Sequence, residues 1–250
     1  MKKDRKYGKI QESARTDRRE KKVRSTETHY RHEWKHAINY TDLLVIRQRL
    51  RAVAEPDPHA KDGKYLIRSL YFDNRRDKAL REKIDGVNMR EKFRIRYYNG
   101  DTSLIHLEKK SKLNGLGAKF SADLTVEEAQ NIVAGKTDWM RDSERSVVQE
   151  LYCKMQYQRL EPKTIVEYTR EPFIFSPGNV RVTFDYDIRT GLSCTDFLNP
   201  GCVMIPAGDA GIILEVKWDA FLPNIIRDAV WVPGRREVAF SKYAQCRIYG

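Results

Sequence analysis

The stretch from Met89 to Asn99 alternates between charged and mostly apolar residues with the period of a β-strand. Arg90, Lys92, Arg94 and Arg96 fall on one face of that strand, because successive side chains point to opposite sides. Cations two strand residues apart lie roughly 7 Å from one another and repel by ~2 kcal/mol per neighbouring pair at an effective dielectric of about 20. A solvated surface has little use for such a face, so the pattern predicts that an anion binds to it.

Similar strand segments recur along the chain, at residues 30–38, 64–72, 104–110, 118–124, 164–170, 180–188 and 212–218. Most of them have one charged face and one apolar face. If the apolar faces pack under helices, the charged faces must meet inside a closed sheet. Seven or eight strands can close into a barrel whose polar lumen has room for a ligand. The pattern therefore predicts an α+β fold, a closed β-barrel with helices packed on the outside.

The helices are expected between pairs of strands rather than in regular alternation with them. Thr41 and Asp42 offer an N-cap for an amphipathic helix that ends before Pro56. A capping box from Thr125 to Glu128 predicts a short helix that ends near Gly135. A polar helical turn is expected up to about residue 83, and further helices at residues 143–157, 220–230 and 240–248.

The chain is expected to form one folded domain, residues 28–250, preceded by a disordered basic tail, residues 1–27. The tail holds 11 Lys and Arg against 5 Asp and Glu and almost no apolar residues, so it cannot bury enough surface to fold alone. The whole chain has 47 Lys and Arg against 35 Asp and Glu, a net charge of +12. This charge favours a polyanionic partner: nucleic acid, a phosphate polymer, a nucleotide or an anionic membrane surface.

The four cysteines, Cys153, Cys194, Cys202 and Cys246, are scattered and form no Cys-x-x-Cys pair. They are interpreted as reduced thiols of a cytoplasmic protein rather than as zinc ligands. No apolar run approaches the length of a membrane-spanning helix, and the basic N-terminus lacks the apolar core of a secretory signal. The predicted location is cytoplasmic, with any membrane association peripheral or through a partner.

Five short motifs follow one another in a characteristic order. They are Arg31–Lys35 (RHEWK), Leu70–Asp73 (LYFD), Arg94–Tyr98 (RIRYY), Leu214–Lys217 (LEVK) and Phe240–Tyr243 (FSKY). From about Tyr30 to Gly250 this ordered set resembles the polyphosphate polymerase domain of the vacuolar transporter chaperone complex, the VTC domain of the triphosphate tunnel metalloenzymes. The resemblance implies a tunnel of eight antiparallel strands. In that tunnel the terminal phosphoryl group of ATP would pass to a growing polyphosphate chain, assisted by Mn²⁺ or Mg²⁺.

Roles for individual residues follow from the resemblance and from strand parity. The residues expected to act at the reacting phosphates are Arg94, Arg96, Ser241 and Lys242. The resemblance places Lys35, Lys110, Lys119, Tyr168, Arg170 and Arg181 in the substrate-binding lumen, and parity adds Arg90, Lys92 and Lys217. Glu215 is the first choice of metal ligand, with Glu33 and Glu108 as helpers, since hard divalent cations prefer oxygen ligands.

One departure from the wider superfamily bears on the reaction. Its first strand begins Glu-x-Glu-x-Lys, whereas this chain has Arg31 in the first position, which removes an acidic metal ligand and favours a polymerase over a hydrolase. Two alternatives stay open: a triphosphatase of the same fold, and a non-catalytic polyanion-binding module. The expected partners are ATP and polyphosphate, and no specific nucleic acid is expected. An integral-membrane partner protein is a further candidate. Because like charges crowd the lumen, Arg94→Ala and Arg96→Ala are expected to stabilise the free protein slightly.

Overall fold

The computed structural model describes residues 31–209 and 211–248, so the predicted disordered tail lies outside the described residues. The helices are α1 (Tyr40–Val53), α2 (Lys78–Ile84), α3 (Val126–Val133), α4 (Ser146–Gln158), α5 (Asn224–Val230) and α6 (Lys242–Ile248). The long strands are β1 (His32–Ile38), β3 (Tyr65–Asp73), β4 (Arg90–Tyr98), β5 (Asp101–Leu113), β6 (Leu116–Leu124), β7 (Glu161–Phe175), β8 (Val180–Thr190) and β10 (Ile212–Trp218). Two short strands, β2 (Glu55–Pro56) and β9 (Ile205–Pro206), pair with β7 and β8.

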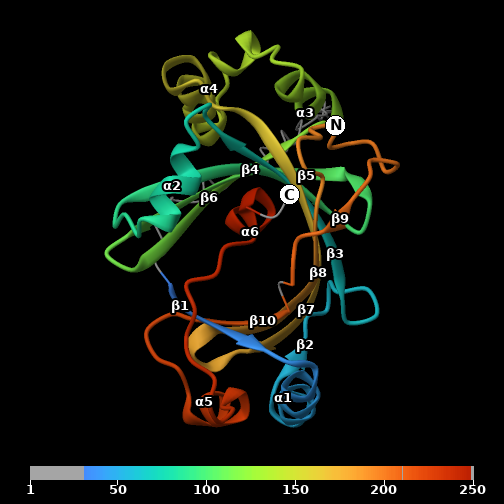
Figure 1. The fold of residues 1–250 in the computed structure, drawn as a ribbon, viewed down its shortest axis with the longest axis vertical. Coiled ribbons are helices and arrows are strands. Elements are labelled where there is room, and N and C mark those ends of the chain that lie inside the picture. Colours follow the sequence, from blue (N-terminus) through green and yellow to red (C-terminus); the bar gives the residue numbers. More distant parts are fainter. Residues whose placement is uncertain (1–30, 210, 249–250) are drawn as a thin grey trace, which may run out of the picture.

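The eight long strands form one antiparallel sheet that curls around a central space (Figure 1). Their order is β1-β10-β8-β7-β3-β4-β5-β6, so the chain begins at one edge of the sheet and the other edge comes from its middle. β4 and β5 form a hairpin at Asn99-Gly100, where both residues have a positive φ (53° and 74°). This is the backbone that Asn-Gly favours in tight hairpins.

The prediction of a closed barrel is wrong, because the sheet stays open between its two edge strands. Among the described residues, one bridge joins these edges: the amide of Arg31, immediately before β1, donates to the carbonyl of Gly117 in β6 at 3.3 Å. The edge of β1 that does not pair with β10 is bonded instead by a segment from near the C-terminus. The amide of Val238 donates to the carbonyl of Lys35 at 2.8 Å, and Glu237 bridges to His36. A segment from near the C-terminus thus takes the strand edge that β6 would need to close the barrel.

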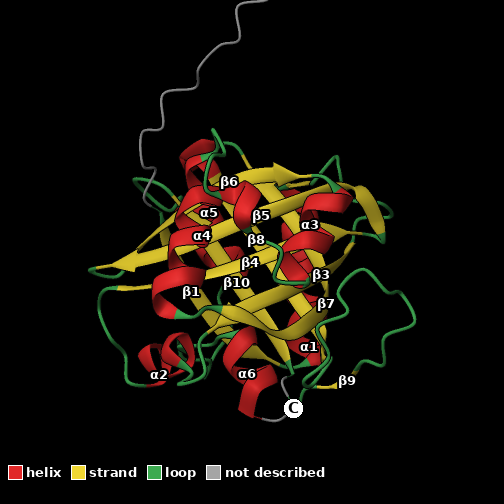
Figure 2. Ribbon diagram, turned by 90° about the horizontal axis from the view of Figure 1, so that it is seen from above, coloured by secondary structure: helices red, strands yellow, loops and turns green. Residues whose placement is uncertain are grey.

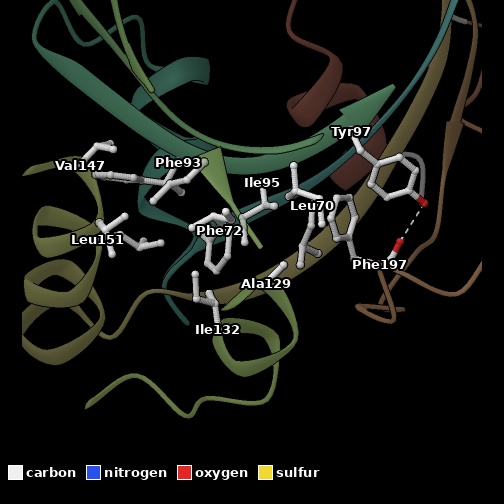
Figure 3. Close-up of a cluster of buried hydrophobic side chains, with 14 of the residues drawn as sticks. Leu70, Phe72, Phe93, Ile95, Tyr97, Ala129, Ile132, Val147, Leu151 and Phe197 are labelled. Atoms are coloured by element: carbon white, nitrogen blue, oxygen red, sulfur yellow. Dashed lines mark hydrogen bonds between the residues drawn. The ribbon is translucent and has the colours of Figure 1, made fainter. Parts of the chain in front are cut away.

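The apolar faces of the strands pack under helices as the alternation predicts. Phe93, Ile95 and Tyr97 point away from the four cations of β4 and enter a core beneath α3 and α4 (Figure 3). A second core lies between the sheet and the pair α1 and α5. The helix α1 is capped by Asn39 rather than at Thr41, whereas the predicted capping box of α3 is confirmed.

The helix α6 departs from the prediction that helices cover only the outside. It contacts β7 and β8 and lies with α2 at one end of the curled sheet (Figure 2). Its Tyr243 and Cys246 are buried against residues of the lumen-facing side, Tyr71 and Tyr168 among them. The inner face of β3 and β7 is therefore apolar enough to hold a helix, which places the C-terminal motif beside the lumen.

Candidate active site

A cavity of about 1000 Å³ occupies the inside of the curled sheet. Thirteen Lys and Arg but only six Asp and Glu line it, so the lumen has a strong excess of positive charge. Fourteen of the sixteen residues predicted to form the site are among the lining residues. The other two lie next to lining residues: Tyr168 accepts from Arg96, and Lys242 contacts Asp185, which pairs with the lining residue Arg170.

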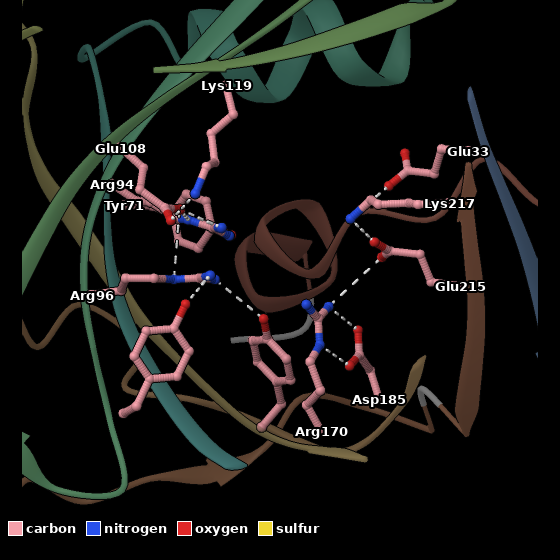
Figure 4. Close-up of polar contacts among 12 residues, drawn as sticks. Glu33, Tyr71, Arg94, Arg96, Glu108, Lys119, Arg170, Asp185, Glu215 and Lys217 are labelled. Carbon is pink, nitrogen blue, oxygen red and sulfur yellow. Dashed lines mark hydrogen bonds and ion pairs between the residues drawn. The ribbon is translucent and has the colours of Figure 1, made fainter. Parts of the chain in front are cut away.

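The wall formed by β4 to β6 is built around one buried carboxylate. Glu108 is 2 % exposed and accepts from Nε and Nη2 of Arg94, at 2.8 and 2.6 Å (Figure 4). Nε of Arg96 lies 3.7 Å from it, and Nζ of Lys119 lies 3.2 Å from its second oxygen. Burial alone would raise the pKa of Glu108, but Arg94 and Arg96 hold that pKa well below its usual range.

Tyrosine hydroxyls also accept hydrogen bonds from the two arginines. Nη1 of Arg94 donates to the hydroxyl of Tyr71 at 2.8 Å, and Nη2 of Arg96 donates to the hydroxyl of Tyr168 at 3.2 Å. The guanidinium of Arg96 also lies over the ring of Tyr98. Both forks are thereby held in place while their charge is only partly compensated, which suits the binding of an anion with several oxygens.

Lys92 and Lys110 face the same space, and other cations lie near both of them. Across residues 31–209 and 211–248, neither ammonium group forms an ion pair. Burial, with the charges of Lys35 and Arg94, lowers the pKa of Lys92 to about 7. The charge of Arg94 and burial hold the pKa of Lys110 well below its ordinary value. A bound phosphate group would favour the charged form of each lysine, since a nearby opposite charge raises the pKa of an ammonium group.

The opposite wall, formed by β1 and β10, carries alternating acids and bases. Nζ of Lys217 lies 3.4 Å from Glu33 and also contacts Glu215 (Figure 4). Nζ of Lys35 lies 3.0 Å from Glu33. Burial would raise the pKa of Glu215, yet Lys217 and Lys35 keep it well below its usual range. The same burial would raise the pKa of Glu33, as does Glu215, but Lys217 and Lys35 lower it. Both carboxylates are ionised and close together.

Asp185 is a site residue that the sequence did not single out. It is fully buried on β8, its two oxygens accept from Nε and Nη2 of Arg170 at 2.6 and 2.7 Å, and Nζ of Lys242 lies 2.5 Å away. Lys242 also sits over the ring of Tyr168. The alternation of β8 placed Asp185 on the same face as Arg181, and an acid among lumen cations was the available signal. Asp185 thus orients a wall arginine and the lysine of the C-terminal motif together.

Asp73 and Ser241 hold the C-terminal motif in position. Both oxygens of Asp73 accept from backbone amides at the start of α2, and one of them accepts from the hydroxyl of Tyr243 at 2.7 Å. The rings of Tyr71 and Tyr243 stack, with centroids 5.1 Å apart. Ser241 lines the cavity immediately before α6, and its hydroxyl accepts from the amide of Ala244 at 3.4 Å. The motif containing Asp73 therefore connects α2, β3 and α6.

Two predicted binding residues lie away from the central cluster. Nη2 of Arg181 contacts Asp57 at 2.5 Å, and its side chain is 38 % exposed. Arg90 donates to the carbonyl of Val87 at the N-terminal end of β4. These positions suit contacts with the outer part of a bound polyanion better than contacts with its centre.

The carboxylates of the lumen fit a divalent cation that arrives with its substrate. Among the residues that the structure describes, no three His, Cys, Asp or Glu side chains cluster closely enough to cage a metal ion. Mg²⁺ and its analogues commonly use only one or two carboxylates together with waters and substrate phosphates. Glu33 and Glu215 offer such a pair, since both contact the ammonium of Lys217. Glu108 lies on the opposite wall, apart from both.

The curled antiparallel sheet, the cationic lumen and the paired acids on one wall define the class of triphosphate-tunnel proteins. The model of the VTC domain matches residues 30–248, which is most of the chain. The chain therefore belongs to the VTC domain family. Membership supports a function in polyphosphate or triphosphate chemistry and suggests the use of a divalent metal.

Solved structures give only distant matches. A putative adenylate cyclase from Bacillus halodurans shares 11% identity over 81% of this chain and 86% of that chain, with a TM-score of 0.44. The PH1012 protein from Pyrococcus horikoshii OT3 shares 12% over 80% and 85%, with a TM-score of 0.42. The PH1819 protein from the same organism shares 15% over 80% and 84%, with a TM-score of 0.39. No curated protein matched the chain. In the described part of the chain, no helix has the length and apolar character needed to cross a membrane.

Proposed function

We propose that the protein is an ATP-dependent polyphosphate polymerase that transfers the terminal phosphoryl group of ATP to a polyphosphate chain in the lumen. The observation that carries the proposal is the pair of facing walls. One wall has cations without enough counter-charge, Lys92 and Lys110 above all, and the other has ionised Glu33 and Glu215. A phosphate chain would supply the missing negative charge between them.

Phosphoryl transfer needs positioning and cations where negative charge accumulates, rather than covalent chemistry from the protein. Arg94 and Arg96 are held by tyrosine hydroxyls in orientations that leave guanidinium groups directed at the lumen. They would grip phosphate oxygens on two sides, and Lys242, oriented by Asp185, would approach the reacting group from α6.

Glu215 and Glu33 would hold the divalent cation, Mn²⁺ or Mg²⁺. When bound, such an ion neutralises charge on the phosphate oxygens. Lys217 provides positive charge at the same two carboxylates. Glu108, already surrounded by Arg94, Arg96 and Lys119, is better suited to orienting those cations than to binding metal. A docking role for an integral-membrane partner stays a prediction.

The test is the product formed from ATP. Purified protein with ATP and Mn²⁺ is expected to release ADP and build long phosphate chains, resolved by gel electrophoresis and digested by a polyphosphatase. Glu215→Gln is expected to lower turnover by roughly 100-fold or more, because it removes charge at the metal. Free phosphate as the sole product would instead identify a triphosphatase. If the unmodified protein and Glu215→Gln both bind polyanions but neither turns over ATP, the protein is a binding module.

Binding of tripolyphosphate at about pH 8 is expected to take up protons. Lys92, with its pKa near 7 in the free protein, is then largely neutral and becomes charged beside phosphate. Lys110 contributes in the same direction. Titration calorimetry in buffers of different ionisation enthalpy should show an uptake of about one proton by Lys92 at pH 8. That uptake should disappear near pH 5, well below the pKa of about 7, where Lys92 is already protonated in the free protein.

The matched variants for this titration are Lys92→Gln and Lys112→Gln, two substitutions of lysines that line the cavity. The first is expected to remove about one proton from the uptake at pH 8, and the second to leave it nearly unchanged. A proton count that Lys92→Gln leaves unchanged from that of the unmodified protein would show that phosphate does not bind beside Lys92.

A further inference from the structure

Two of the four cysteines meet in the loop that leads from β8 to β10. The Sγ atoms of Cys194 and Cys202 are 2.8 Å apart, and both side chains are half-buried. A disulfide joins its sulfurs at about 2.05 Å, so bond formation requires an approach of only about 0.8 Å more. Neither cysteine lines the lumen, so this pair is separate from the site described above.

We propose that Cys194 and Cys202 form a thiol–disulfide exchange site, whose oxidising substrate is a low-molecular-weight disulfide. The protein then has a dithiol form and a form with an internal Cys194–Cys202 bond. The sequence predicted reduced thiols because the four cysteines are scattered and no Cys-x-x-Cys pair is present. Loop geometry, rather than spacing, brings the sulfurs together.

The part of the loop between the two cysteines is anchored to the outside of the sheet. Phe197 is 1 % exposed and packs on the ring of Tyr97, whose hydroxyl donates to its carbonyl at 3.2 Å. Nη1 of Arg68 donates to the carbonyl of Asn199 at 2.8 Å. The amide of Cys202 donates to the same carbonyl at 3.2 Å. These contacts hold the loop in the folded protein, so oxidation needs no rearrangement of the sheet.

The other half of the loop is equally constrained. The amide of Cys194 donates to the carbonyl of Gly191 at 2.9 Å. A Cβ on Gly191 would lie 3.1 Å from Cβ of Ile165, so the backbone approaches β7 closely where the loop begins. Both sulfurs are therefore presented by ordered backbone, which favours an internal bond over two separate adducts.

The reaction balances as an exchange of disulfide for dithiol. One cysteine thiolate attacks the small disulfide and expels one small thiolate, which gives a mixed disulfide on the protein. The second cysteine thiolate attacks the protein sulfur of that mixed disulfide and expels the other small thiolate. Two protons pass from the cysteines to the two leaving thiolates, and two electrons pass from the protein to the small molecule. Burial and the neighbouring thiol raise the pKa of Cys202 to about 11, so the exchange is slow at neutral pH and faster in alkali.

The full-length folded protein is treated with excess oxidised glutathione at about pH 9, blocked with an alkylating reagent and digested with trypsin. Cys194 and Cys202 fall in one tryptic peptide, Thr190–Lys217. That peptide is expected to lose the mass of two hydrogens and to regain it after dithiothreitol. Exposed Cys153 is an internal control that should carry a glutathione adduct. A Thr190–Lys217 peptide with two glutathione adducts, or with two alkylated thiols, would overturn the proposal.

Two variants separate the internal bond from general oxidation. In Cys153→Ser the pair remains, and oxidation is expected to raise the melting temperature by a few degrees, because closing the loop restricts the unfolded chain. In Cys202→Ser the same treatment should give a single adduct on Cys194 and no such rise. Since the pair lies outside the lumen, oxidised Cys153→Ser should bind tripolyphosphate as tightly as the reduced form. A failure of the proposed polymerase activity would leave these expectations unchanged.

Discussion

Glu108→Gln is expected to lower the melting temperature of the free protein by about 10 °C and to strengthen its binding of tripolyphosphate. The substitution preserves the shape of the side chain and removes the charge that Arg94 and Arg96 face. Removing one partner of a buried ion pair costs about 3–5 kcal/mol, because the other charge stays buried without compensation. Each kcal/mol corresponds to about 2–4 °C in a domain of this size. A bound polyanion would then supply the charge that glutamate gave.

Thermal unfolding with and without tripolyphosphate measures both effects in one experiment. Asp142→Asn is the matched control, because Asp142 pairs with Arg141 on the surface and both side chains are mostly exposed. That control should leave both melting temperatures unchanged, since exposed ion pairs contribute little. If Glu108→Gln behaves like the control, the carboxylate is not the counter-charge of the two lumen arginines.

Asp185→Asn is expected to lower kcat for phosphoryl transfer by roughly 100-fold. Its carboxylate holds Nε and Nη2 of Arg170 and the ammonium of Lys242, so the substitution releases two cations from their orientation. Loss of positioning at a phosphoryl-transfer site commonly has an effect of this size. Because the residue is fully buried, unfolding should also become easier, by about 3 kcal/mol.

Steady-state kinetics well below the melting temperature separate these two effects. Asp187→Asn is the matched control, since Asp187 lies two residues further along the same strand and its side chain is exposed. It should match the unmodified protein in rate and stability. A normal kcat in Asp185→Asn would show that Lys242 and Arg170 act independently of this carboxylate, whatever the change in stability.

The strands and their faces could be predicted from the sequence because alternation has a period of two and each strand is half-buried. The face of β4 illustrates this: Phe93, Ile95 and Tyr97 pack outward, and Arg94 and Arg96 point into the lumen. Family motifs then singled out residues on β1, β4, β10 and α6. Their placement around one cavity is what the structure adds, while their roles in the reaction stay predictions.

The counter-charges could not be predicted in the same way. Repulsion along β4 alone predicts that Arg94→Ala stabilises the free protein, but Glu108 faces Arg94 across the β4–β5 ladder. The structure therefore predicts that the substitution destabilises the protein, since it leaves Glu108 short of a partner. The hairpin at Asn99-Gly100 was the available signal, but a bulge between Arg96 and Tyr98 shifts the register that it sets. The contact of Asp185 with Lys242 depends on β8 and α6 meeting, which no local sequence pattern reveals.

The closed barrel failed for a related reason. Whether β1 and β6 join depends on what else competes for the edge of β1, and that competitor is a segment two hundred residues away, near Glu237 and Val238. Such a choice is made between backbone hydrogen bonds of similar strength. Side-chain alternation carries no information about it.

In the described part of the chain, the bridge between Arg31 and Gly117 is the weakest join in the wall around the lumen. The other junctions between neighbouring long strands are ladders of several paired residues, whereas one backbone hydrogen bond between described residues, worth about 1 kcal/mol, links the edges at β1 and β6. Thermal breathing should therefore part the wall at this point first. A polymer much longer than the cavity could then enter or leave laterally, between the edges of β1 and β6, without passing end-first through the lumen.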